Sequence, residues 1–300
     1  MELRQLEYFV AVAEEQSFTR AAERVHISQS GVSAQIRRLE RELGAELFDR
    51  SARTATLTVA GKAALEHARA ALSAAGAVGQ AVSAVTGLIS GRLTVGMVNG
   101  CTITPLFDAL AAFHAAHPGV RLSLLEDNSD RLVESVRDGA VDVALVGTTA
   151  PPDGLESWTI VSERLVAAVP PAHPLAARGT VTLRELSDHP LVCMPPGTGL
   201  RTLFDQACAA QGLRPVISLA AGAADAIAAL AARGLGVAVL SESMASAYRD
   251  RLTALPLTDV EAPALLALTW RNTPNPAVRA LLHHSRRTFT ASDRTRHERQ

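Results

Sequence analysis

One short stretch of the chain, Phe18 to Glu40, carries side chains suited to reading DNA bases. Val32, Ile36 and Leu39 recur at helical spacing, so a helix from Ser28 would bury that face and expose the opposite one. Gln and Arg side chains make bidentate hydrogen bonds to the edges of adenine and guanine. We therefore expect the following residues to contact bases or the adjoining phosphates: Ser28, Gln29, Ser30, Ser33 and Arg37.

The elements around this stretch are those of a helix-turn-helix. Ser17 or Thr19 can cap one short helix, and Ser28 can cap the next, with Val25-His26-Ile27 as the turn between them. Such a motif, here about 18–37, places the start of its second helix in the major groove. Two extended pieces between residues 48 and 59 predict a hairpin. Its Arg50 and Arg53 are predicted to reach phosphates or the minor groove.

Charge is distributed in agreement with this interpretation. Residues 24–62 hold seven basic and four acidic side chains, whereas residues 1–23 hold two basic and five acidic ones. The basic end should therefore face DNA, although the whole chain has a net charge of −1. That net charge argues against a protein that coats nucleic acid non-specifically by bulk positive charge.

A second candidate site follows two predicted strands in the C-terminal part. The strand at 92–98 leads into a helix start at Gly100-Cys101-Thr102, and the strand at 191–194 leads into Pro195–Arg201. Backbone N–H groups at a helix start favour an anion, and ligands of open α/β sheets bind beyond the carboxyl ends of strands. Asp225 argues against a purely anionic ligand. We expect a small effector, chiefly an organic anion, to contact Gly100, Cys101, Thr102, Gly197, Thr198, Gly199, Arg201 and Asp225.

The chain divides into four segments by periodicity and composition. Residues 1–58 are charge-dense and helical with a terminal hairpin, and residues 59–90 predict one Ala-rich helix. Its seam of small and aliphatic residues suits packing against a partner helix. Residues 91–290 alternate strand and helix, which predicts parallel sheets in two α/β lobes, about 91–162 with 267–290 and about 163–266. Residues 291–300 lack an apolar period and predict a disordered tail.

At fixed spacings the sequence resembles the LysR-type transcriptional regulators. The matching segments are Leu3-Arg4-Gln5-Leu6, Ser17–Ala22, Ser28-Gln29-Ser30, Gln35–Glu40, Glu42-Leu43-Gly44, Leu47–Arg50 and Leu57-Thr58 with Ala60-Gly61. The resemblance implies an α+β multidomain protein with a winged helix-turn-helix, a dimerising linker helix and a two-lobed, periplasmic-binding-protein-like effector domain. It also implies operator DNA as a partner, an effector held between the lobes, and a homodimer that associates into a homotetramer. Ala34 and Ser30 depart from the family, which usually has Arg at the first position and often Pro at the second.

Other classes fit the sequence less well. No GxSxG, Walker, HExxH or GxGxxG motif is present, so we expect no enzyme, cofactor or metal site. The N-terminus lacks the pattern of a signal peptide, no apolar stretch could span a membrane, and three cysteines suit a reducing compartment, so we expect a cytoplasmic location rather than a secreted solute-binding protein. A thiol-based redox regulator of the same fold, using Cys193 and Cys208, remains the alternative.

Overall fold

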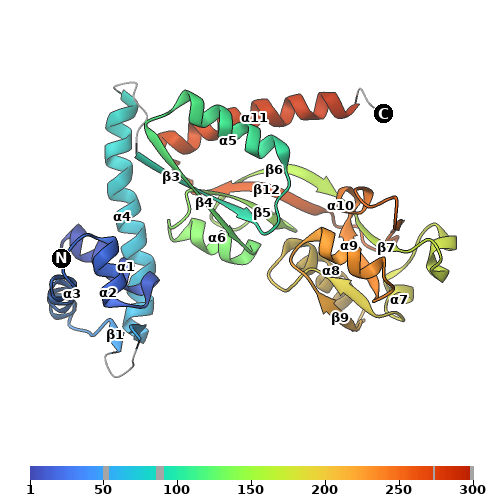
Figure 1. Cartoon of the computed structure of the whole chain (residues 1–300), viewed down its shortest axis with the longest axis horizontal. Helices are drawn as coiled ribbons and strands as arrows, with labels where there is room; N and C mark the ends of the chain where they lie inside the picture. Colours follow the sequence, from blue (N-terminus) through green and yellow to red (C-terminus); the bar gives the residue numbers. More distant parts are fainter. Residues whose placement is uncertain (50–53, 86–90, 273, 298–300) are drawn as a thin grey trace. The chain divides into compact units, whose positions relative to one another are not determined.

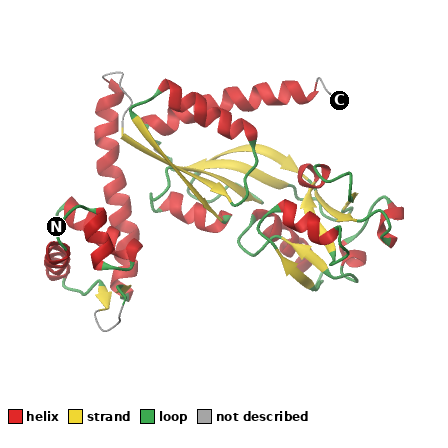
Figure 2. Ribbon diagram, viewed as in Figure 1, coloured by secondary structure: helices red, strands yellow, loops and turns green. Residues whose placement is uncertain are grey.

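A computed structural model describes residues 1–49, 54–85, 91–272 and 274–297. The chain separates into two compact units, shown in Figures 1 and 2. The first comprises Met1–Ile89 together with Asp138–Ala140, and the second comprises Ser90–Arg137 and Val141–Gln300.

Three short helices build the core of the first unit: α1 (Leu3–Glu15), α2 (Phe18–Arg24) and α3 (Gln29–Leu43). The predicted caps are confirmed, because the Ser17 hydroxyl accepts the Arg20 N–H and the Ser28 hydroxyl accepts the Gly31 N–H. Gly44 ends α3 in the left-handed conformation, with φ of 71°. The apolar faces of the three helices close on a fully buried centre that includes Phe9, Val12, Val32, Ile36 and Leu39.

The predicted hairpin is a two-stranded ribbon of β1 (Phe48–Asp49) and β2 (Thr56–Leu57), paired antiparallel. The Phe48 ring lies edge-on to both Phe9 and Phe18, which joins the ribbon to the helical core. The next helix, α4 (Val59–Val85), begins directly after β2. A Cβ on Gly61 would lie 2.1 Å from the Leu47 carbonyl oxygen, so this start of α4 requires glycine.

The first half of α4 packs inside its own chain. Ala68 is buried in the apolar core of α1–α3, and Leu65 and Leu72 are partly buried against it. Figure 1 shows α1 lying against α4. Part of the predicted seam of small and aliphatic residues therefore packs against α1 within the chain, and its pairing with a partner helix stays a prediction.

Two five-stranded sheets form the second unit. The first has the order β4-β3-β5-β12-β6 and the second the order β11-β7-β10-β8-β9. The strands of the first are β3 (Gly91–Val98), β4 (Val120–Asp127), β5 (Val143–Thr148), β6 (Glu156–Glu163) and β12 (Ala264–Trp270). Those of the second are β7 (Leu165–Val169), β8 (Leu191–Cys193), β9 (Ile217–Ala220), β10 (Val237–Ser241) and β11 (Thr253–Pro256).

Helices cover both sheets, as the alternating pattern predicted. Lobe 1 is the lobe built on the first sheet and lobe 2 the lobe built on the second. In lobe 1, α5 (Thr104–Ala116) and α11 (Pro276–His297) pack together on one face of the sheet, and α6 (Ser129–Arg137) covers the other (Figure 1). Lobe 2 carries the remaining helical elements, which are η1 (Pro174–Arg178), α7 (Leu183–Leu186), α8 (Gly199–Ala210), α9 (Ala224–Ala231) and α10 (Glu242–Ser246).

The sheets are mixed rather than parallel. β3, β4 and β5 run parallel, as do β8, β9 and β10, but β12 pairs antiparallel with β5 and β6, and β7 pairs antiparallel with β10 and β11. The antiparallel members come from the two places where the chain passes between lobes without a covering helix. β6, which was not predicted, ends at Glu163, close to the predicted lobe boundary at about 162, and β12 begins at Ala264, three residues before the predicted return to the first lobe at 267.

The C-terminal helix is longer than expected. α11 continues to His297, so the prediction of disorder from 291 is wrong for residues 291–297. Pro and Gly are absent from this segment, and adding residues to an existing helix is much easier than starting one. No helix in the described part of the chain is long and apolar enough to cross a membrane.

Candidate nucleic-acid interface and interlobe site

The exposed face of α3 is the first candidate site. Ser28, Gln29, Ser30 and Arg37 are exposed and Ser33 is half-buried, while Val32, Ile36 and Leu39 are fully buried on the other side. The structure thus brings together the four α3 residues and the Ser28 cap that the sequence singled out. Ala34 is exposed on the same helix, so this chain presents a methyl group where the resemblance implies an Arg side chain.

The polar side chains on this face differ in the hydrogen bonds and ion pairs that they make within the protein. The Ser28 hydroxyl caps α3 through Gly31 N and lies 3.1 Å from the Ser30 hydroxyl. By contrast, no hydrogen bond or ion pair of the Arg37 guanidinium occurs within the described residues, whereas the neighbouring Arg38 bonds Glu42 at 3.1 Å. Arg37 is therefore the long cationic side chain that this face can offer to a base or a phosphate.

The turn before α3 is held in an unusual conformation. His26 has φ of 57°, in the left-handed region that residues with a side chain seldom adopt. The N–H of Ile27, the next residue, donates to the Ala22 carbonyl at 3.1 Å and so fixes the angle between α2 and α3.

Glu40 connects α3 to the ribbon and was missed by sequence reasoning. Its side chain is only 7% exposed, and Oε1 accepts the N–H groups of Leu47 at 2.9 Å and Phe48 at 3.4 Å. A carboxylate on the buried side of an otherwise apolar helix face was the available signal. Arg50 and Arg53, predicted at the tip of the hairpin, lie outside the described residues.

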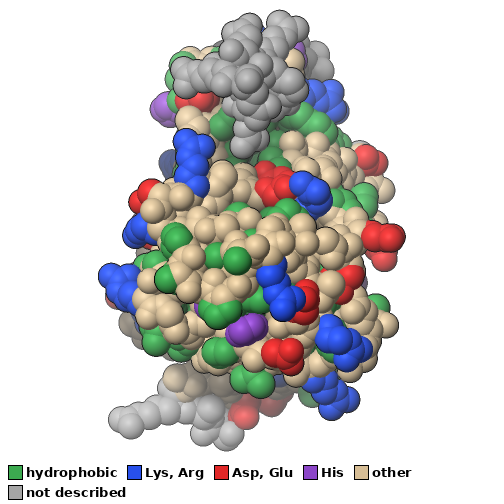
Figure 3. Space-filling view, turned by 90° about the vertical axis from the view of Figure 1, so that its right-hand side faces the viewer, with side chains coloured by type: hydrophobic (Ala, Val, Ile, Leu, Met, Phe, Trp, Pro, Cys, Tyr) green, Lys and Arg blue, Asp and Glu red, His purple; other side chains and the backbone are tan. Residues whose placement is uncertain are grey.

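Charge on the face of the molecule turned toward the viewer in Figure 3 is of both signs. Arg side chains there are interspersed with Asp and Glu among apolar and polar surface. The part of that face formed by described residues therefore offers no extended basic surface.

The second candidate site lies where the two lobes of the second unit meet, here called the interlobe junction: residues 99–102, 128–130 and 147–148 of lobe 1 with 197–199 and 223 of lobe 2. Gly100 follows β3 in the left-handed conformation, and a Cβ there would lie 3.4 Å from that of Ala223. The Asp130 N–H donates to the Gly197 carbonyl at 3.2 Å. Gly100 and Gly197, predicted separately from two strands, are thus both placed at this junction.

Backbone meets backbone at the centre of the interlobe junction. A Cβ on Gly199 would lie 2.2 Å from the Gly147 carbonyl carbon and 2.5 Å from Thr148 N, so α8 of lobe 2 touches the end of β5 directly. The buried Ser129 hydroxyl accepts the Gly147 N–H at 3.0 Å and holds β5 in place. Asn128, Ser129 and Gly147 were not predicted, although Asn128 and Ser129 directly follow β4 and Gly147 lies next to the end of β5.

Three residues that were predicted to bind the effector form hydrogen bonds within the protein. The Thr198 hydroxyl donates to the Pro195 carbonyl at 2.8 Å. Arg201 Nε donates to both carboxylate oxygens of Asp205 at 2.9 Å and its Nη1 to the Met194 carbonyl, so the carboxylate that this guanidinium meets is one of the protein's own. Asp225 is exposed in the first turn of α9 and accepts the Ala226 N–H.

The cysteines lie in environments that suppress thiolate formation. Cys193 and Cys208 are buried in the lobe 2 core, and burial raises the pKa of the Cys193 thiol to about 12 and that of Cys208 to about 11. Burial also raises the pKa of the half-buried Cys101 thiol at the interlobe junction. Because the thiolate is the species that reacts with oxidants, this arrangement disfavours the redox alternative. No group of three or more His, Cys, Asp or Glu suited to a metal ion occurs among the described residues.

Comparisons with known proteins agree with the division into units. Residues 3–62 match the family described as bacterial regulatory helix-turn-helix protein, lysR family, and residues 86–290 match the LysR substrate binding domain. The uncharacterized HTH-type transcriptional regulator YnfL of Escherichia coli (strain K12) is 36% identical over 289 residues, covering 95% of this chain and 97% of that protein. ShiR of Corynebacterium glutamicum (strain R), also an HTH-type transcriptional regulator, is 34% identical and covers 90% of this chain and 92% of its own length.

Solved full-length structures are similar over nearly the whole chain. A full-length variant of OxyR from Pseudomonas aeruginosa has a TM-score of 0.71 at 25% identity, covering 95% of this chain and 96% of that one. Full-length CbnR complexed with its target DNA has a TM-score of 0.59 at 28% identity, covering 96% of this chain and all of that one.

Proposed function

We propose, for a chain that belongs to the LysR family of transcriptional regulators, that α3 reads an operator and that a small organic anion at the interlobe junction controls the reading. The family assignment gives a DNA-binding regulator with an effector-binding domain. Which residues do the reading, which hold the effector, and how copies of the chain assemble are the parts that we infer.

The single observation that carries the proposal is the polarity of α3. One face is buried through Val32, Ile36 and Leu39, and the other presents Gln29 and an Arg37 guanidinium that the described residues leave unengaged. In a helix-turn-helix the exposed start of the second helix enters the major groove, where Gln and Arg read adenine and guanine. Ser28, Ser30 and Ser33 would supply shorter contacts to bases or phosphates, and Arg50 and Arg53 the contacts of the wing.

Pairing of two chains is assigned to α4. Its first half is covered by α1, but Val78 further along is 66% exposed. A second copy of the helix is the partner that we propose for that part, giving a homodimer that reads a two-fold site and associates into a homotetramer. The cytoplasm, where operator DNA is found, is the proposed location, and we predict no catalytic activity.

We assign the effector to the interlobe junction because segments of both lobes meet there, Gly199 against Gly147 and Gly197 against Asp130. Thr102 is an exposed hydroxyl beside the start of α5, and Thr198 and Arg201 lie at the start of α8. A ligand carboxylate would replace Asp205, which is 51% exposed, as the partner of Arg201. An effector that binds one arrangement of the lobes better than another shifts the population toward that arrangement.

The test is a binding titration at fixed salt on the DNA upstream of the protein's own gene, with a scrambled duplex as the comparison. A specific site should bind at least about a thousandfold more tightly than the scrambled duplex. Arg37→Ala should weaken specific binding by about 1–3 kcal/mol, which is the usual value of a bidentate base contact.

Arg214→Ala is the matched control for Arg37→Ala. Arg214 is also exposed, its loss changes the net charge equally, and it lies in lobe 2 rather than on α3. If both variants lower affinity equally, Arg37 contributes only long-range charge. If neither changes affinity, α3 is not the reading helix and the proposal is wrong.

A further inference from the structure

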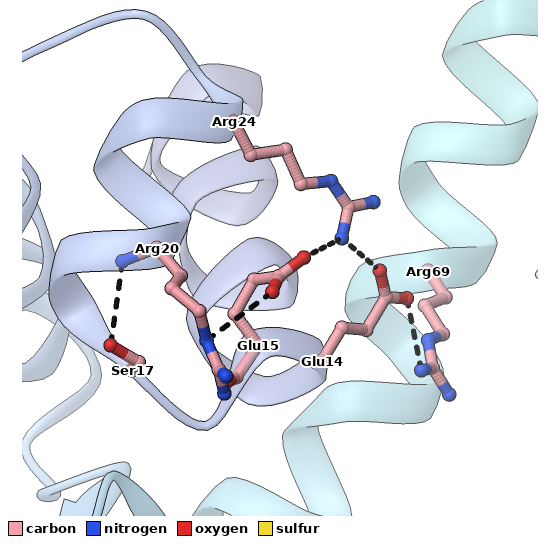
Figure 4. Close-up of polar contacts among 6 residues, drawn as sticks. All are labelled: Glu14, Glu15, Ser17, Arg20, Arg24 and Arg69. Carbon is pink, nitrogen blue, oxygen red and sulfur yellow. Dashed lines mark hydrogen bonds and ion pairs between the residues drawn. The ribbon is translucent and has the colours of Figure 1, made fainter.

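A chain of ion pairs links three helices of the first unit (Figure 4). Glu14 and Glu15 end α1, Arg20 and Arg24 belong to α2, and Arg69 belongs to α4. Glu14 Oε2 lies 2.7 Å from Arg24 Nη1, and its other oxygen, Oε1, lies 3.1 Å from Arg69 Nη2. One carboxylate thus joins α2 and α4 at the same time.

Glu15, the neighbouring carboxylate, has a different reach. It contacts Arg24 at 3.4 Å and Arg20 at 3.7 Å, and both of these belong to α2. Arg20 also donates to the Glu15 carbonyl oxygen. Within Figure 4, therefore, Glu15 joins α1 only to α2, whereas Glu14 extends the link to α4.

Alanines make up much of the apolar surface that α4 turns to the core of α1–α3. Three of its five side chains there are Ala64, Ala68 and Ala71, and the other two are Leu65 and Leu72. Alanines form a smooth surface that excludes water but resists rotation or sliding weakly, since few side chains interlock. The ion pairs are directional and half-buried, with the Arg69 side chain 23% exposed and that of Glu14 30% exposed. These ion pairs are therefore the contacts suited to fixing the angle between α1 and α4.

We propose that Glu14 is a positioning residue that sets the angle of the α1–α3 block on α4, and thereby the spacing at which a dimer reads two half-sites. The inference rests on the proposed pairing of two chains through α4. α1, α2 and α3 supply most of one core, which α4 joins through Ala68 and the side chains next to it. A change of angle at α4 would therefore move the three helices together. A small rotation at Glu14 displaces each reading helix, and half-site spacing in such dimers follows the distance between the two reading helices.

The experiment selects bound duplexes from a random DNA pool with the full-length protein and sequences them. It compares wild type, Glu14→Gln and Glu15→Gln, which remove the same charge from adjacent positions. Glu14 is the site of choice because Arg69 Nη1 also contacts Asp138, so a change at Arg69 would break two links. Circular dichroism and thermal midpoints confirm that each variant is folded.

Wild type should select one paired motif at one dominant spacing. Glu14→Gln should keep the half-site sequence but spread the spacing, so that the share at the dominant spacing falls about twofold or more, because register is set by the distance between reading helices. Glu15→Gln should keep the wild-type spacing.

Three results would overturn the inference. One is an unchanged spacing distribution in Glu14→Gln, and another is equal broadening in both variants, which would assign the effect to the α1–α2 contact. The third is a changed half-site sequence in Glu14→Gln, which would mean that α3 itself has moved. If wild type selects single half-sites or no motif, the proposed pairing or the proposed reading function fails instead, before either variant is compared.

Discussion

Replacement of Gly199 by alanine should push the two lobes of the second unit apart. The added Cβ would lie 2.2 Å from the Gly147 carbonyl carbon and 2.5 Å from Thr148 N, and both of these are backbone atoms that no side-chain rotation can move. Gly199 has an ordinary helical backbone at the first position of α8, so alanine introduces no strain in its own conformation. The clash with β5 is the whole of the unfavourable effect.

The size of that effect follows from the geometry. Ordinary contact begins near 3.4 Å, so α8 or β5 must retreat by about 1 Å, an overpacking that typically destabilises by about 1–3 kcal/mol. Alanine favours the helix over glycine by up to about 1 kcal/mol, which offsets a part of this. The net destabilisation should lower the thermal unfolding midpoint of the second unit by roughly 2–8 °C. Differential scanning calorimetry of the full chain measures it directly.

Gly222→Ala is the matched control, because a Cβ there meets nothing within 4 Å. It should leave the midpoint within about a degree of wild type, as surface changes do. DNA affinity should be unchanged in both variants, since neither residue lies in the first unit. Equal midpoints for Gly199→Ala and Gly222→Ala would refute the reasoning that backbone contact holds the lobes together.

Three further outcomes are expected from named contacts. Glu40→Ala leaves the buried N–H groups of Leu47 and Phe48 without their acceptor and should destabilise the first unit by about 1–3 kcal/mol in thermal unfolding, with Glu40→Gln recovering a part of that loss. Cys208, with a thiol pKa of about 11, should be about one ten-thousandth thiolate at pH 7, so Cys208→Ser should leave peroxide-treated and untreated protein with the same DNA affinity as wild type. Burial, and then the neighbouring His117, lower the pKa of His284, so the unfolded state takes up a proton first as pH falls below about 6.5 and stability should decline there. His284→Gln should flatten that decline in urea titrations between pH 7 and pH 5.

Local signals in the sequence were enough to predict the first unit closely. The caps at Ser17 and Ser28 and the apolar period of α3 depend on residues within a few positions of each other, and the structure has all of them. The mixed sheets were not predicted, because the direction of β12 and β7 depends on how the chain crosses between lobes, which leaves no local pattern. The length of α11 was missed because periodicity detects a buried face, not a helix as such.

The candidate sites divide in the same way. The spacing of the apolar residues in α3 defines its buried face and hence the opposite, exposed face, so Gln29 and Arg37 could be identified from spacing alone. At the interlobe junction, Gly199 was predicted because it follows a strand, but the sequence does not show which residue it contacts. The role of Gly147 is visible only in the fold, where α8 packs against it. The pairing of Arg201 was not predicted, because Asp205 lies one helical turn away and could equally have faced solvent.

The interlobe junction has a consequence for how an effector can act. Its closest contacts join backbone to backbone, at Gly199 with Gly147 and at Gly197 with Asp130, so they demand close placement but contribute few hydrogen bonds. A contact of that kind is lost after a displacement of about 1 Å, because dispersion and hydrogen bonding both weaken steeply with distance. Two arrangements of the lobes can then differ by only a few kcal/mol.

An effector acts on this balance only through groups that it contacts differently in the two arrangements. To reverse a 1:99 population it must favour one arrangement by about 5.5 kcal/mol. Because Arg201 already pairs with Asp205, exchanging that carboxylate for the ligand's adds little by itself, and the preference has to come from bonds that reach the other lobe in one arrangement only. An effector that contacts one lobe alone would bind both arrangements equally and shift nothing, so we propose that it engages both lobes, through Thr102 of lobe 1 and Arg201 of lobe 2.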